Sequence, residues 1–220
     1  MATGRWLSTR HVLRHFAMVG VCLAVVWPGA NVSAAGDPPD GAIPDPLVVG
    51  NPALRASLER IHRGSALWRA ELERASQTGR RVVVLSADQV KVTDGDASGE
   101  ARAFDAGLLA EVSVIAGAGS RVDAVLVAVN VRLLDETHQR LGLPWSARNA
   151  DLDRILVHEV YGHALPYLLA GDVSGRCADA EMNERAIDAC AIRRENAVRA
   201  ELGLGRRADS GLLSLALARY

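Results

Sequence analysis

The sequence predicts a single α+β domain in which amphipathic helices pack against a small, mostly antiparallel sheet. Its 220 residues are enough for one domain with a buried core. Apolar residues make up 49% of the chain and aromatic residues only 4%, a balance that suits helices packed on a modest sheet. Short β-branched runs lie in the middle of the chain, between two regions of helical periodicity.

The charge balance argues against nucleic acid as a partner. Lysine and arginine number 25, and aspartate and glutamate number 26, so the formal net charge is −1. Binding to nucleic acid phosphates needs clustered positive charge, which this composition does not favour. The low aromatic content also argues against a surface on which bases stack.

The first 35 residues have the pattern of a secretory signal peptide. Basic residues precede an apolar run, which a proline, a glycine and then small residues follow. These features are Arg5, Arg10 and Arg14, the run 16–27, Pro28-Gly29, and Val32 to Ala35. Cleavage after Ala34 or Ala35 predicts an exported protein, periplasmic or secreted, without stable membrane insertion. The alternative is an uncleaved anchor, but the apolar run is shorter than the ~20 residues of a spanning helix.

A linker and two helices are expected next. Residues 36–50 are rich in Pro, Gly and Asp, which predicts an extended linker before a folded domain of residues 51–220. Asn51-Pro52 is a typical helix start. The apolar residues that follow predict one or two amphipathic helices, interrupted near Gly64 and ended by Gly79.

Strands are predicted from the β-branched runs. Arg81 to Ser86 is the first, and residues 112–115 and 122–131 are two more. The glycine-rich turn 117–120 joins the last two, and so short a turn connects only antiparallel neighbours. His138 is expected in the connection after them.

Two long helices are predicted in the last third of the chain. The first begins at Asn149 or Asp151 and runs to Gly171, and the second is marked by apolar residues from Ile187 to Leu202. Without the signal peptide, Cys177 and Cys190 are the two remaining cysteines, and an even pair in an exported protein predicts one disulfide. Thirteen residues of continuous helix would hold them ~20 Å apart, so the second helix must start well after Cys177.

The first of these helices contains two histidines and a glutamate in the pattern of a zinc site. His158-Glu159 is followed by His163, and a catalytic zinc needs nitrogen or oxygen ligands beside a carboxylate that takes a proton from water. The spacing is five residues instead of the usual four, which in a regular α-helix turns the two rings ~140° apart. A π-bulge restores a common face, and Gly162 is placed to permit one.

A downstream segment completes a resemblance to a known family. Asn183-Glu184 lies about twenty residues after His163, and Asp188 follows one helical turn later. The sequence here resembles the thermolysin-like gluzincin metallopeptidases, which pair a His-Glu helix with an Asn-Glu-x-x-x-Asp helix. The resemblance implies zinc as cofactor, a gluzincin-like core, Glu184 as third zinc ligand and Asp188 as the group that orients His158. The six-residue histidine motif departs from that pattern and resembles the longer motif of dipeptidyl peptidase III.

Other residues compete for roles at this site. The C-terminal third, with Glu195 and the segment 199–204, is similar to small bacterial effector-type metallopeptidases, and Glu195 either supports the site or is a surface charge. Glu181 is the main competitor for third ligand, followed by Asp179 and Asp172. Four candidates to stabilise an oxyanion stay open, namely Tyr161, Tyr167, His138 and Arg193.

The expected function is that of an exported zinc metallopeptidase acting on a peptide or protein. Glu159 is the expected general base, which takes a proton from a zinc-activated water. One alternative is a non-catalytic envelope or secreted domain that keeps zinc for structure or binding, which the altered histidine spacing favours. Another is a metal-dependent amidase acting on cell-wall peptides.

Overall fold

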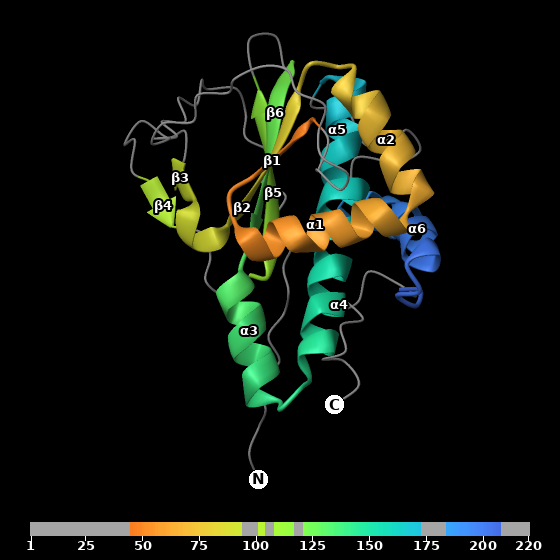
Figure 1. Cartoon of the computed structure of the whole chain (residues 1–220). Helices are drawn as coiled ribbons and strands as arrows, with labels where there is room; N and C mark the ends of the chain where they lie inside the picture. The colour runs from red at the N-terminus through yellow and green to blue at the C-terminus, as the bar shows by residue number, and fades with distance from the viewer. Residues whose placement is uncertain (1–44, 94–100, 104–107, 117–120, 173–183, 208–220) are drawn as a thin grey trace.

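The computed structural model describes residues 45–93, 101–103, 108–116, 121–172 and 184–207, which form a mixed α+β fold (Figure 1). The strands are β1 (Leu47–Val49), β2 (Arg81–Ser86), β3 (Lys91–Thr93), β4 (Ala101–Ala103), β5 (Ala110–Ala116) and β6 (Val122–Val129). The helices are α1 (Pro52–Gly64), α2 (Ala66–Ser76), a short 3₁₀ helix η1 (Ala87–Gln89), α3 (Val131–Arg140), α4 (Trp145–Leu156), a π-helix η3 (Val157–Ala164), α5 (Leu165–Ala170) and α6 (Glu184–Glu201).

The main sheet is mostly parallel, so the prediction of a mostly antiparallel sheet is wrong. Its strand order is β1-β2-β6-β5, in which β1 and β6 both run parallel to β2. Only β5 is antiparallel to its neighbour β6, as the turn between them predicts. The parallel pairings join strands that are distant in sequence, and no local turn specifies them. The short strands β3 and β4 form a separate antiparallel pair.

The two faces of the main sheet pack against different parts of the molecule. On β2, Val82 and Val84 belong to the large core, whereas Val83 and Leu85 belong to a second, smaller cluster. This alternation is the period-two pattern of a strand buried on both faces. Helices α2, α4, α5 and α6 lie on one side of the sheet, and β3 and β4 lie on the other (Figure 1).

The first helical pair begins and breaks where the sequence predicts. Asn51 caps α1, and its side-chain oxygen accepts a hydrogen bond from the backbone nitrogen of Ala53 at 2.8 Å. Ser65 ends α1 and caps α2, since its hydroxyl accepts from the nitrogen of Trp68 at 3.0 Å. Trp68 is fully buried, which anchors α2 in the core.

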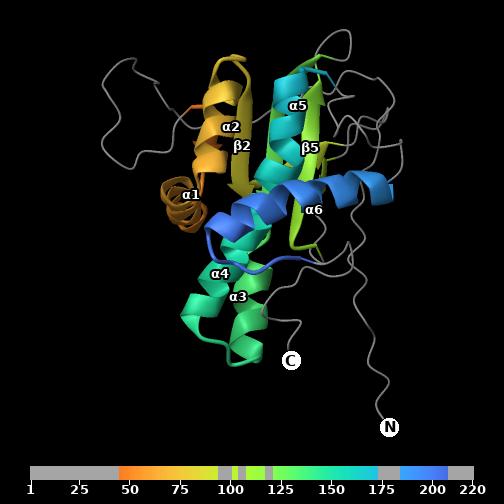
Figure 2. The same cartoon turned by 90° about the vertical axis from the view of Figure 1, so that its right-hand side faces the viewer.

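The helix that carries the histidines is longer than predicted. It starts at Trp145, before the expected Asn149 or Asp151, and continues through α4, η3 and α5 to Gly171, whose φ of 81° ends it in the left-handed conformation. His138 lies in α3, not in a connection, and its Nε2 is 2.9 Å from the buried carboxylate of Asp151. In both views, the α3–α4 hairpin extends away from the sheet (Figures 1 and 2).

The folded domain starts earlier in the chain than predicted, because it includes strand β1. It lies within the predicted linker 36–50, yet Leu47 and Val49 are buried and the strand pairs with β2. The domain boundary at residue 51 is therefore wrong, and the fold includes β1. The signal segment 1–35, the linker residues 36–44 and Cys177 lie outside the described residues. Among the described helices, none is long and apolar enough to cross a membrane.

Candidate metal centre

The histidine motif forms a π-helix, as the spacing argument predicts. Residues Val157 to Ala164 adopt this wider turn between α4 and α5, and every one of them is buried. A π-helix accommodates one more residue per turn than an α-helix, so that positions five apart share a face. His158 and His163 are therefore neighbours on the same side of the helix.

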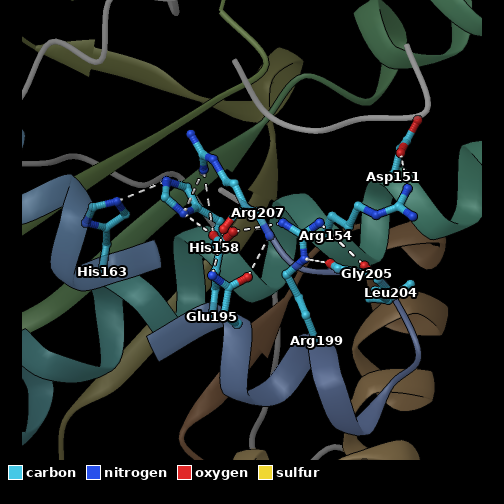
Figure 3. A network of polar contacts seen from close by, with 10 residues as sticks. Asp151, Arg154, His158, His163, Glu195, Arg199, Leu204, Gly205 and Arg207 are labelled. Carbon is cyan, nitrogen blue, oxygen red and sulfur yellow. Dashed lines mark hydrogen bonds and ion pairs between the residues drawn. The ribbon is translucent and has the colours of Figure 1, made fainter. Parts of the chain in front are cut away.

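The two imidazole rings meet edge to face. Their centroids are 4.7 Å apart at an interplanar angle of 89°, and the Nε2 atoms of His158 and His163 are 3.2 Å apart. Both side chains are buried, His158 fully and His163 to 7% exposure. The two ring nitrogens thus converge on one point inside the protein (Figure 3).

Glu195 orients the first of these rings. Its Oε2 contacts Nδ1 of His158 across the interface between η3 and α6. An ionised carboxylate only accepts hydrogen bonds, so we assign the ring proton to Nδ1 of His158. Nε2 of His158 then carries a lone pair and accepts a hydrogen bond from Nε2 of His163. This is the tautomer in which Nε2 is free of its own proton for metal binding.

Two arginines surround the Glu195 carboxylate. Arg199 donates from Nη1 to Oε1 at 2.8 Å, and Nη1 of Arg207 is 3.7 Å from Oε2. All three side chains are buried, with Glu195 at 0% exposure. Burial raises the pKa of the Glu195 carboxyl above its ordinary value, while the positive charges of Arg207 and Arg199 oppose that rise. The arginines thus favour the ionised carboxylate that His158 needs as an acceptor.

The geometry of the two rings fits zinc. Zinc binds imidazole nitrogen at about 2.0–2.1 Å, so two such ligands at a tetrahedral angle lie about 3.3 Å apart. The Nε2 atoms of His158 and His163 are 3.2 Å apart, which agrees with that spacing. A metal held by His158 and His163 would replace the proton between the two nitrogens, because histidine binds metal through a deprotonated nitrogen.

The other residues predicted for the site are described to different extents. Glu159 is buried at 4% exposure on η3, between the two histidines in the chain. Glu184 is the first residue of α6 and Asp188 lies one turn later, but their side chains are outside the described ones. Among the described side chains, no group of three or more His, Cys, Asp or Glu could hold a metal. The third ligand therefore stays a prediction.

The position expected for Asp188 is filled by another carboxylate. The family resemblance assigns the contact with the second ring nitrogen of His158 to Asp188, whereas Glu195 makes this contact in the structure. Glu195 is thus a supporting residue of the site and not a surface charge. Both residues lie on α6, and Glu195 is about two turns further along the helix.

The candidates for oxyanion stabilisation have varied surroundings. Tyr161 is buried, its ring stacks on Trp68 at 6.1 Å, and Arg194 lies 4.8 Å above its centroid. Burial raises the pKa of the Tyr161 hydroxyl, and Glu71 adds to the rise. His138 bonds Asp151 in the α3–α4 hairpin. Tyr167 is buried and Arg193 is exposed. Asp172, a competitor for third ligand, is exposed and forms an isolated β-bridge with Arg121.

Cys190 is buried on α6. Its predicted partner Cys177 and the competing ligands Asp179 and Glu181 lie outside the described residues. The pairing of Cys177 with Cys190 therefore stays a prediction. The expectation that this helix starts well after Cys177 concerns residues outside the described ones and also stays a prediction.

Sequence reasoning missed the two arginines of the site. Arg199 lies four residues after Glu195 on one helix, and this spacing is a signal that could have paired them. Arg207 follows two glycines beyond the end of α6, and nothing local in the sequence connects it to His158.

No family model matches the chain, and neither the curated proteins nor the solved structures contain a match to it.

Proposed function

We propose that the protein is an exported zinc metallopeptidase whose metal ligands include His158 and His163. The observation that carries this proposal is the convergence of their Nε2 atoms to 3.2 Å on a π-helix. Two unrelated histidines five residues apart on a regular helix would not face one another. A π-helix is also a costly departure from regular structure that is frequent at functional sites.

Glu184 is the proposed third ligand, as in the gluzincin arrangement. It lies at the start of α6, the helix that packs across η3 (Figure 2). In this proposal the third ligand comes from a second element and not from the helix of the histidines. Glu181 is the alternative ligand, and we test both.

The proposed chemistry is hydrolysis of a peptide bond. Zinc bound at such a site acts as a Lewis acid that lowers the pKa of a water molecule. With zinc bound, Glu159 would be the general base, because its carboxylate can accept a proton from water and donate it to the leaving amine. Glu159 is only 4% exposed, so its surroundings have a low dielectric constant. Neighbouring charges therefore act more strongly on the proton transfer than they would in water.

The test is metal content by elemental analysis. We expect one zinc per chain in the protein purified without residues 1–35, and loss of that zinc in His163→Ala and Glu184→Ala. Glu181→Ala is the matched control for the third ligand and should retain the metal. His62→Ala, on α1 and outside the motif, is the matched control for histidine loss.

Activity is tested separately from binding. Glu159→Gln should keep zinc and abolish peptide hydrolysis, because the amide cannot accept the proton of water. Zinc without hydrolysis of any peptide in the unaltered protein would favour a structural or binding domain, and cleavage restricted to cell-wall peptides would favour an amidase. Absence of zinc after reconstitution would contradict the metal site itself.

A further inference from the structure

The chain reverses direction after α6 and returns to the metal centre. Residues 202–207, here called the C-terminal strap, follow the end of α6 at Glu201. Gly203 and Gly205 have φ angles of 67° and 52°, a left-handed conformation that glycine adopts without strain. These two turns bring Arg207 back beside the helix that the chain has just left.

Side chains of α6 hold the strap in place. Asn196 donates from Nδ2 to the carbonyl of Arg207 at 2.8 Å and accepts from its nitrogen at 2.7 Å. Arg199 donates from Nε to the carbonyl of Gly205, also at 2.8 Å. The backbone on both sides of the turn is thus fixed, so Arg207 enters the interior at a defined place.

The guanidinium of Arg207 ends at the contact between Glu195 and His158. Nη1 is 3.7 Å from Oε2 of Glu195 and 3.3 Å from Nδ1 of His158. Because Nδ1 donates its proton to Glu195, it has no lone pair for Arg207, and the carboxylate oxygen is the group that attracts the arginine. Arg207 is only 3% exposed, so water screens this attraction weakly.

We propose that Arg207 is a positioning residue for His158: it holds Oε2 of Glu195 against Nδ1 of His158 and thereby fixes the ring that offers Nε2 to the metal. Arg199 holds the other carboxylate oxygen, Oε1, at 2.8 Å. The two arginines therefore contact different oxygens of Glu195, and Arg207 lies at Oε2, the oxygen that faces the histidine. This inference rests on the proposed zinc site, but the orientation of the ring does not require the metal.

The experiment compares Arg207→Met with Arg206→Met in the purified protein. Arg206 is the adjacent residue and is exposed, so the same chemical change there is the matched control. Zinc affinity is measured by competition with a chromophoric chelator. The ¹⁵N resonances of the His158 ring, measured in metal-free protein, report which nitrogen carries the proton.

We expect Arg207→Met to weaken zinc binding by roughly 10–100-fold, the usual effect of losing a group that supports a ligand. In the metal-free protein, the ring of His158 should change from a single Nδ1-protonated form to a mixture of tautomers. Arg206→Met should alter neither quantity. Arg207→Lys keeps the charge but not the planar fork, and it should lose part of the affinity.

Two results distinguish this inference from the function on which it rests. If the unaltered protein binds no zinc, the proposed function fails, while the ¹⁵N spectrum of the metal-free ring still decides the role of Arg207. If Arg207→Met binds zinc and shows ring resonances like the unaltered protein, the positioning role is overturned and the zinc site stands. Should Arg207→Met not fold, Arg207→Lys with unaltered affinity and resonances overturns the role in the same way.

Discussion

Glu195 is the residue on which the buried charges of the site depend. It is fully buried, and its two oxygens face His158, Arg199 and Arg207. Burial of a carboxylate is costly unless positive charges and hydrogen bonds compensate it. Here the compensation is mutual, because the arginines are themselves buried and need the carboxylate. For the same reason, burial lowers the pKa of Arg199 while the contact with Glu195 raises it.

Glu195→Gln should therefore destabilise the protein even without metal. The amide keeps the size of the side chain but leaves Arg199 and Arg207 without a buried counter-charge. Breaking a buried pair in this way costs about 3–5 kcal/mol. Urea unfolding of the metal-free protein measures the change, with the exposed Glu73→Gln as control. A stability equal to that of the unaltered protein would show that the carboxylate is not the centre of this network.

At the same scale, the sequence predicts the contact between the two histidines better than the residues that surround them. His158 and His163 lie in one short motif, so their common face could be inferred from spacing alone. The contact between Glu195 and His158 depends on how α6 crosses η3, which no local pattern specifies. Arg207 is further removed, because its place depends on the turns at two glycines.

At the scale of elements, η3 and α6 approach each other more closely than they could if η3 carried a side chain at the point of contact. A Cβ at Gly162 would lie 3.1 Å from Cβ of Ala191 and 3.3 Å from its Cα and carbonyl oxygen. Such distances are shorter than ordinary contacts between carbon atoms. Gly162 therefore matters for this close approach as well as for the π-helix, and the distance between His158 and Glu195 depends on it.

Gly162→Ala should separate the two helices. Overpacking of this kind costs about 1–3 kcal/mol, and because α6 carries Glu195, we expect weaker zinc binding together with lower stability. Both are measured as for the other variants. The control is Gly50→Ala, where a new Cβ would meet only side-chain atoms of Leu85 and Gln89, which belong neither to α6 nor to the C-terminal strap, so zinc binding should be unchanged.

A second substitution tests the mechanism of this effect. Adding Ala191→Gly to Gly162→Ala removes the closest of the contacts, so stability and zinc affinity should recover in part. Full retention of both quantities in Gly162→Ala alone would contradict a role for close packing.

The π-helix itself was predictable, because the chemistry of two ligands on one ion demands a common face. The contact with Ala191 was not, because it joins two helices.

For the molecule as a whole, the topology of the sheet was the least predictable feature. The hairpin of β5 and β6 follows from a local turn, whereas β2 pairs in parallel with β1 and β6 across long stretches of chain. Strand β1 is only three residues long and follows a segment rich in proline and glycine, so its composition resembles a linker. It is a strand because it pairs with β2.

Removal of β1 should therefore unfold much more than a linker would. Leu47 and Val49 are 8% and 9% exposed, and burial of each such side chain contributes roughly 1.5–3 kcal/mol. Two hydrogen bonds depend on the same segment: the backbone nitrogen of Gly50 donates to the carbonyl of Val84, and Nη2 of Arg55 donates to the carbonyl of Val49. A chain that begins at Asn51 should lose a large part of a typical stability of 5–15 kcal/mol.

Urea unfolding of four proteins tests this boundary. A chain that begins at Asp45 keeps β1, and its stability relative to the chain that begins at Gly36 measures the contribution of residues 36–44. Leu47→Ala with Val49→Ala keeps the strand backbone but loses the buried side chains, so its stability should lie between those of the chains that begin at Asp45 and Asn51. If the chain that begins at Asn51 were as stable as the longest one, β1 would contribute nothing to the fold and the linker would extend to residue 50. The sheet would then consist of three strands with β2 at its edge, and Val82 and Val84 would keep their burial through the helices alone.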